Sequence, residues 1–202
     1  MYVKKFGGFI ITAQIPDLFL LGNEEYVIAG VNGEIFIPEK WGMHPIGMCS
    51  ANWRGYLVIY AIQDNELVLN QLQINLVDDN ESDFTPKIGP ELNGVQPQYN
   101  PQHHLNNFYE DLNLPLNFTG GILLGKDFIQ ELYVHMGFHP AWKYKTVYEL
   151  VFQEGKLIEK RDMTEKMAEI RDKLADEPLK PDFSKTDLHE WIQSTFRMDY
   201  DY

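Results

Sequence analysis

Two histidines have a spacing that could bind a metal ion. His135 and His139 are four residues apart, so a continuous helix would place both ring systems on one face. Gly137 lies between them and favours the end of a helix, and no third ligand or adjacent glutamate completes a zinc motif. We therefore expect a structural role for both histidines, and we predict no metal site and no cofactor.

A thiol and an imidazole form the second combination that could do chemistry. Cys49 is the only cysteine, and His44 precedes it closely. A nucleophilic thiol needs a neighbouring cation or imidazole that lowers its pKa, and the sequence supplies only proximity, so we expect an inert, buried thiol. The sequence contains no serine nucleophile elbow, phosphate-binding loop or dinucleotide fingerprint. No residue is assigned a catalytic role on this basis.

Two tryptophans are each followed by a cation, as Trp53-Arg54 and Trp142-Lys143. A cation beside an indole can form a cation–π pair or a hot spot at an interface. The alternative is that both tryptophans open core strands while the cations extend to solvent. We take Trp53 and Arg54 as candidate contacts with a partner.

The chain is acidic, with 30 Asp and Glu against 17 Lys and Arg and a formal net charge of -13. Phosphate contacts need clustered basic side chains, so nucleic acid is not expected as a ligand. A basic protein partner is compatible with this charge, and so is a surface that only keeps the protein soluble. The candidate contacts for such a partner are the acids that open the central segment, Asp78, Asp79, Glu81 and Asp83.

Cysteine content and hydropathy bear on location. A single cysteine allows no disulfide within the chain, which is typical of a reducing compartment. The apolar run near residues 9–11 is too short for a signal peptide, and no stretch reaches the length of a membrane span. We therefore expect a cytoplasmic protein that does not bind a membrane.

Two segments repeat the same landmarks in the same order, which indicates an internal duplication. Gly42-Met43-His44-Pro45 precedes the first Trp-cation pair, and Gly137-Phe138-His139-Pro140 precedes the second. The fold class that we predict is α+β, with an antiparallel β-rich core built from two related halves and with C-terminal helices. We expect one domain over 1–202, made of a first β unit (9–77), a Pro-rich acidic connecting loop (78–116), a second β unit (117–160) and C-terminal helices (161–202).

In the first β unit, Asn32-Gly33 between two apolar runs predicts a hairpin over 26–37. A strand over 56–62 is followed by a returning strand over 67–77. The apolar residues of the returning strand change parity between Leu69 and Leu72, which predicts a β-bulge near Asn70-Gln71.

Local pattern predicts a helix over 127–136, followed by a hairpin of residues 147–152 and 156–159. Residues 78–117 are too apolar for disorder, so we expect an ordered loop packed over the sheet. At the C-terminus, apolar residues from Met163 to Leu174 fall at helical spacing behind a capping residue, Asp162, and a second helix is expected to begin at Ser184 or Thr186.

The run Trp53-Arg54-Gly55-Tyr56-Leu57-Val58-Ile59-Tyr60, with the charged turn and Leu-rich strand after it, resembles small uncharacterised bacterial proteins. Some of these are similar to immunity proteins of polymorphic toxin systems. The resemblance implies an intracellular protein-binding protein, such as an immunity or inhibitor protein for a basic partner. The alternative is an enzyme with a site between the pseudo-repeats, built from His44, His139, Glu39 and Glu131. Convergence of these four side chains in one cleft would favour the enzyme.

Overall fold

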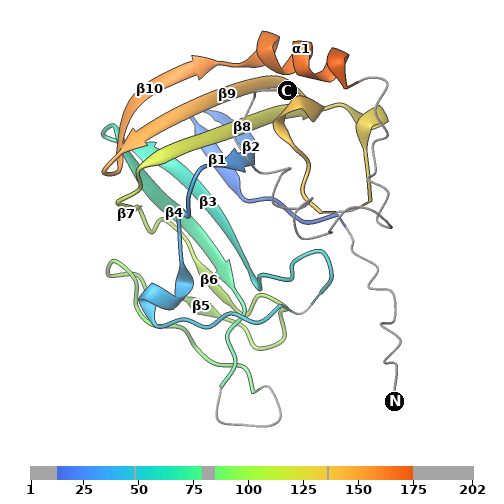
Figure 1. Ribbon diagram of the computed structural model, residues 1–202. Coiled ribbons are helices and arrows are strands. Elements are labelled where there is room, and N and C mark those ends of the chain that lie inside the picture. Colours follow the sequence, from blue (N-terminus) through green and yellow to red (C-terminus); the bar gives the residue numbers. More distant parts are fainter. Residues whose placement is uncertain (1–12, 48, 79–84, 136, 175–202) are drawn as a thin grey trace, which may run out of the picture.

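The computed structural model describes residues 13–47, 49–78, 85–135 and 137–174. Seven strands form a sheet that closes on itself in the order β10-β9-β8-β2-β1-β3-β4, because β10 also pairs with β4 through Lys156 and Glu66 (Figure 1). The barrel strands are β1 (Leu18–Leu21), β2 (Glu24–Val31), β3 (Tyr56–Gln63), β4 (Glu66–Ile74), β8 (Gly120–Phe128), β9 (Tyr144–Gln153) and β10 (Lys156–Asp162). The predicted β-rich core is therefore confirmed.

The barrel is antiparallel except at one place. β1 pairs antiparallel with β2 and parallel with β3, so it lies between two strands that are far apart in the sequence. β1 has only four residues, whereas β2 and β3 have eight each. The short inserted strand leaves part of β2 and part of β3 without a partner between them.

The barrel interior is filled by side chains that alternate along the strands. Phe19, Tyr26, Val58 and Tyr60 point inward with leucines and isoleucines from β4, β8 and β9. Alternation follows from the two-residue period of a strand, which sends successive side chains to opposite faces. A barrel of this size has room for core side chains and at most a small ligand.

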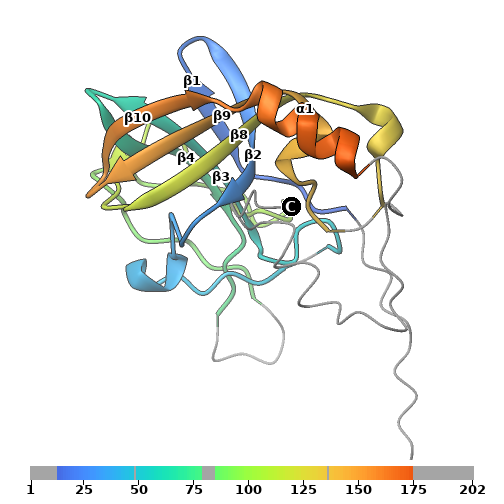
Figure 2. The ribbon, with the colours of Figure 1, turned by 45° about the horizontal axis from the view of Figure 1, so that its top comes forward.

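One helix covers part of the outer surface. α1 (Thr164–Lys173) packs against β9 and the 3-10 turn η3 (Ala141–Lys143), and Figure 2 shows it lying across the outside of the sheet. Met167 and Ile170 are buried in a second cluster beneath it, with Met163 and Leu174 at its ends. The N-cap position is Met163, which makes no side-chain capping bond, so the prediction of Asp162 as the cap is wrong by one residue; the Asp162 carboxylate accepts a hydrogen bond from the Thr164 N–H at 2.9 Å. The predicted first C-terminal helix is confirmed, and the second, at 184–196, falls outside the described residues.

The described part of the connecting loop, residues 85–117, is ordered and packs on the sheet as predicted. It contributes three short strands, β5 (Gln98–Tyr99), β6 (Asn107–Tyr109) and β7 (Leu114–Pro115). β6 and β7 pair with β4, and β5 pairs with β6. Leu92, Tyr109 and Leu112 are buried in the barrel core cluster, so this segment is part of the folded core.

The predicted bulge is confirmed. Ile59 pairs with Gln71 and Tyr60 pairs with Leu69, which leaves Asn70 as the extra residue of β4. The insertion lets Leu69 and Leu72 both face the core, where each is fully buried. The hairpin of β9 and β10 is also confirmed, with Glu154 and Gly155 at positive φ in its turn.

Two predicted elements are wrong. Asn32-Gly33 does not connect a hairpin, because the chain leaves the sheet after Val31 and next forms the 3-10 turn η1 (Pro38–Trp41). The predicted helix over 127–136 is replaced by the end of β8 and the 3-10 turn η2 (Gln130–Leu132). Pairing of Phe128 with Tyr144 extends the strand, and Asp127 at φ 59° cannot continue a right-handed helix.

Both halves contain a strand, a 3-10 turn and then a hairpin of two strands, but the first half has an additional strand, β1, and the second has an additional 3-10 turn, η3. Their strand order in the sheet differs, because β1 lies between β2 and β3 whereas β8 and β9 pair directly. The expected superposition of two related sheets is therefore not confirmed. Among the described residues, no helix is long and apolar enough to cross a membrane.

Candidate binding site at the Trp53–Arg54 corner

The short strand β1 leaves a gap between β2 and β3, and Asp17, the residue before β1, forms hydrogen bonds to both strands across this gap. Leu18 pairs with Val27 and Ile59, so β1 reaches neither the end of β2 nor the start of β3. Asp17 replaces the missing strand: its carboxylate accepts the Val58 N–H at 3.0 Å, and its backbone carbonyl accepts the Ile28 N–H at 2.9 Å. One residue thus satisfies donors from both flanking strands.

Asp17 also holds the residues that we call the Trp53–Arg54 corner, positions 51–54 before β3. Arg54 Nη1 and Nη2 donate to the two carboxylate oxygens of Asp17 at 2.8 and 2.9 Å. Such paired N–H···O bonds fix the orientation of the guanidinium as well as its position. Burial acts to lower the pKa of Arg54, but the charge of Asp17 and its hydrogen bonds to the guanidinium, with smaller contributions from Tyr56 and Tyr60, together raise that pKa. Arg54 therefore stays charged inside a largely apolar wall.

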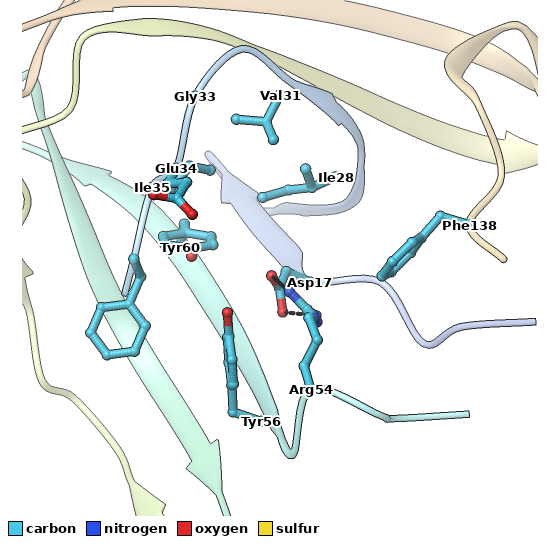
Figure 3. Close-up of a pocket in the computed structure, with 11 residues that line it drawn as sticks. Asp17, Ile28, Val31, Gly33, Glu34, Ile35, Arg54, Tyr56, Tyr60 and Phe138 are labelled. Atoms are coloured by element: carbon cyan, nitrogen blue, oxygen red, sulfur yellow. Dashed lines mark hydrogen bonds and ion pairs between the residues drawn. The ribbon is translucent and has the colours of Figure 1, made fainter. Parts of the chain in front are cut away.

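A cavity of about 310 Å³ lies beside this ion pair, and we call it the mouth pocket (Figure 3). Its wall is formed by the ends of β2 and β3 and by the segment that leaves β2. Its lining residues are Asp17, Ile28, Val31, Gly33, Glu34, Ile35, Phe36, Arg54, Tyr56, Tyr60 and Phe138. Ligand pockets are commonly apolar with a few convergent polar groups, and the mouth pocket has this composition.

Aromatic rings surround the guanidinium. The Arg54 Cζ lies 4.8 Å from the ring centroid of Tyr56 and 5.5 Å from that of Phe138. Phe36 meets Tyr56 edge to face at 6.3 Å. Burial raises the pKa of Tyr56 and raises that of Tyr60 well above its ordinary value. Both phenols therefore remain neutral hydrogen-bonding groups at physiological pH.

Trp53, one residue before Arg54, lies on the outside of the molecule. Its side chain is 63% exposed, the largest exposure among the large hydrophobic residues that the structure describes. Its backbone N–H donates to Gln14 Oε1 at 3.5 Å, and the next residue, Ile15, is 45% exposed. The interpretation of Trp53 as a core residue is wrong, whereas Trp142 is half-buried and packs in the cluster under α1.

A second hollow, of about 270 Å³, lies on the outer face of β1 and β3, and we call it the outer groove. Its apolar lining includes Ile15, Leu18, Leu57 and Ile59, and Gln71 and Gln73 of β4 also line it. Ile15 therefore belongs both to the groove and to the segment that contacts the Trp53–Arg54 corner. The exposed apolar surface of the corner is therefore continuous with that of the outer groove through Ile15.

Of the four acidic residues predicted to contact a partner, only Asp78 lies among the described residues. Asp78 is half-buried, and its N–H donates to the Thr85 carbonyl at 2.9 Å. Asp79, Glu81 and Asp83 lie outside the described residues.

The four residues of the enzyme hypothesis are not brought together. Glu39 lies in η1 and His44 soon after it, while Glu131 lies in η2 and His139 just before η3. Figures 1 and 2 show these two regions on separate sides of the molecule. His139 stacks on Phe128 at 4.7 Å between ring centroids, whereas the other three side chains are exposed. The predicted pseudo-symmetric cleft therefore has no geometric support.

His139 has an environment that explains its electrostatics. Both ring nitrogens are sealed from solvent without a hydrogen-bond partner in the described structure. Burial, with a smaller contribution from the Lys143 charge, lowers the pKa of His139 to about 4. Burial also lowers the pKa of Lys143 to about 8. His139 is therefore a neutral packing residue at physiological pH.

The remaining candidates are simple to place. Cys49 is exposed, so the expectation of a buried thiol is wrong. Within the described ranges, no group of three or more His, Cys, Asp or Glu side chains could hold a metal ion. His135 is exposed, and its Nδ1 lies 2.9 Å from the Tyr133 hydroxyl.

Sequence reasoning identified Arg54 and Trp53 but not Asp17 or Tyr60. Asp17 stands immediately before an apolar run, which is a weak signal for a residue that caps a strand. Tyr60 lies in a strand that is apolar on both faces, so pattern alone does not show that its hydroxyl reaches a cavity. Comparisons with protein-family models, with curated proteins and with solved structures find no match.

Proposed function

We propose that this chain is an intracellular protein-binding protein, of the immunity or inhibitor type, that binds a basic partner through the Trp53–Arg54 corner. The observation that carries the proposal is the 63% exposure of Trp53 on a fixed backbone. Tryptophan is enriched among the residues that contribute most to binding energy at interfaces. A lone exposed tryptophan is costly in water, and a partner that covers it recovers that free energy.

The backbone that presents Trp53 is rigid. Arg54 is locked to Asp17 by two charged hydrogen bonds. Gly47 packs so closely that a Cβ at that position would lie 2.3 Å from the Trp53 carbonyl oxygen. An anchor that is already in place loses little conformational entropy when it binds, and this favours affinity.

The surroundings of Trp53 supply further contact area. Ile15 lies in the neighbouring segment, and the outer groove continues along β1 and β3. An interface of this kind, with an aromatic anchor beside an apolar groove and polar residues at its edge, matches the anatomy of specific protein interfaces.

Net charge selects the partner class. A chain with a formal charge of -13 attracts a basic partner over distances comparable to the Debye length. The acids at 78–83 are the densest cluster and are proposed to steer that partner. Charge then governs the association rate, while Trp53 governs the lifetime of the complex.

The test is a binding measurement with two tryptophan variants. A partner is captured from the source cells, purified, and titrated with wild type, Trp53→Ala and Trp41→Ala. Trp41 is the control because it is also exposed, at 39%, but lies in η1. We expect Trp53→Ala to weaken binding by about 30-fold, in line with a 2 kcal/mol hot spot. Equal affinity of wild type and Trp53→Ala would refute the proposal.

A further inference from the structure

The mouth pocket is a separate feature from the exposed tryptophan and faces the barrel interior. Protein interiors are packed with few voids larger than a water molecule. Here a cavity of about 310 Å³ remains open between the end of β2 and the start of β3. That volume lies at the lower end of the range for small-molecule sites. Its size therefore fits a compact ligand.

The hydroxyl of Tyr60, in the pocket wall, has no hydrogen-bond partner among the described residues. Tyr60 is only 2% exposed, and its hydroxyl makes no hydrogen bond within the described parts of the chain. Its hydroxyl oxygen is not sealed from solvent, and Tyr60 lines the cavity, so the hydroxyl is accessible from the cavity. Buried polar groups nearly always have a partner, and an unpartnered hydroxyl in a cavity wall indicates a ligand that completes it.

The pocket offers donors and flat apolar surface together. Arg54 uses two of its five N–H groups on Asp17. The rings of Tyr56 and Phe138 lie against the guanidinium, and Phe36 lies beside Tyr56. Figure 3 shows Arg54, Tyr56 and Phe138 among the side chains that line the pocket. A planar molecule with a hydrogen-bond acceptor matches both features.

Charge decides which acceptor is favoured. The Asp17 carboxylate neutralises Arg54, and Glu34 adds a second carboxylate to the wall. The pocket therefore carries a net formal charge of about -1, which disfavours an anionic ligand. We propose that the mouth pocket binds an uncharged, planar aromatic molecule whose carbonyl oxygen accepts a hydrogen bond from Tyr60.

The experiment compares two probes with the same ring. Benzamide and benzoate are titrated into the ¹⁵N-labelled full chain, and amide shifts are followed by NMR. We expect benzamide to shift the amides of Gly33, Tyr56 and Tyr60 and to bind at least several-fold more tightly than benzoate. No shift at these amides up to the solubility limit of benzamide would overturn the proposal, and so would tighter binding of benzoate.

Two variants test the roles of the lining residues. Tyr60→Phe removes a hydroxyl that makes no hydrogen bond to any described residue, so we expect an unchanged melting temperature and about 3- to 10-fold weaker benzamide binding. Tyr99→Phe is the control for benzamide binding only, because it removes a hydroxyl outside the pocket that donates to the Pro86 carbonyl at 2.9 Å. Glu34→Gln should strengthen benzoate binding more than benzamide binding, whereas Glu25→Gln, which does not line the pocket, should alter neither. Loss of stability in Tyr60→Phe with unchanged benzamide affinity would show a structural role and overturn the proposal.

Discussion

At the scale of single residues, Asp17 links the strands, the pocket and the Trp53–Arg54 corner. Its carboxylate bonds to Arg54 and to the Val58 N–H, and its carbonyl bonds to Ile28. A partly buried cation is tolerated when its charge is paired and its donors are used. The same pair therefore holds the corner from which Trp53 projects and forms one wall of the mouth pocket.

His139 gives a residue-scale prediction on pH. Its folded-state pKa of about 4 is below the ordinary 6.5, so the unfolded chain binds more protons between these values. The stability that comes from neutral His139 is present above pH 6.5 and is lost as the pH falls towards 4. The groups that face it are Phe128, Tyr133 and Lys143.

We expect His139→Phe to flatten the pH dependence of the unfolding free energy between pH 6.5 and 4, measured by urea denaturation. Phenylalanine keeps the ring stacking and removes two sealed nitrogens. His44→Gln, at an exposed position, should keep the wild-type slope. A His139→Phe curve parallel to wild type over this range would contradict the assignment of neutral, buried His139.

At the scale of elements, the bulge in β4 determines which side chains face the core. Leu67 and Leu69 come before Asn70, and Leu72 and Ile74 come after it. All four side chains are fully buried. A regular strand that kept Asn70 would place Leu69 and Leu72, three positions apart, on opposite faces and would turn Leu72 and Ile74 out of the core. Burial of a leucine or isoleucine side chain contributes about 1.5–3 kcal/mol. Exposing both Leu72 and Ile74 would therefore remove a large part of the unfolding free energy of a typical domain.

We expect deletion of Asn70 to keep a cooperative thermal unfolding transition, monitored by near-UV circular dichroism, because Leu69 and Leu72 then stand two positions apart and stay on the core face. Asn70→Ala, which keeps the bulge but loses the 3.0 Å bond to Asn113, should cost only about 1 kcal/mol. Loss of the cooperative transition in the deletion variant would contradict the assignment of Asn70 as the extra residue of β4.

Elements that depend on local pattern were predictable, and those that depend on distant pairing were not. The parity change in β4 and the turn at Glu154-Gly155 are visible in the sequence, so the bulge and the second hairpin were predicted. The helix expected over 127–136 failed because β9 extends β8 to Phe128. The Asn32-Gly33 hairpin failed because β2 pairs with β1 and β8 instead.

The candidate site shows the same division. Trp53 and Arg54 stand out by residue type, and sequence alone nominated them. The mouth pocket exists because a short strand, β1, inserts parallel to β3, and only the register of that pairing places Asp17 beside Arg54. Local composition carries no trace of a gap that arises from strand length and long-range register.

At the scale of the whole molecule, the acidic surplus is expected to act on association. Neutralising Asp78, Asp79, Glu81 and Asp83 together should slow binding of a basic partner several-fold at low salt. The difference should vanish near 1 M salt, where the Debye length is about 3 Å. Stopped-flow association kinetics across a salt series provide the measurement.

A charge-matched control separates local steering from net charge. Glu131, Glu154, Glu165 and Glu169 are all exposed, and replacing them with glutamine removes the same formal charge elsewhere. We expect this control to associate faster than the first quadruple variant at low salt. Equal rates for the two variants would mean that the segment 78–83 has no specific role in binding.

Hydrogen exchange with and without the purified partner tests the central claim, that the Trp53–Arg54 corner is the contact surface. Amides at Gln14, Ile15 and residues 51–54 should exchange more slowly in the complex, while those of α1 should be unchanged. Loss of this protection in Trp53→Ala, with the free protein otherwise unaltered, is the predicted result. Protection confined to α1, or to η1 and its neighbours, with none at residues 51–54, would contradict the claim.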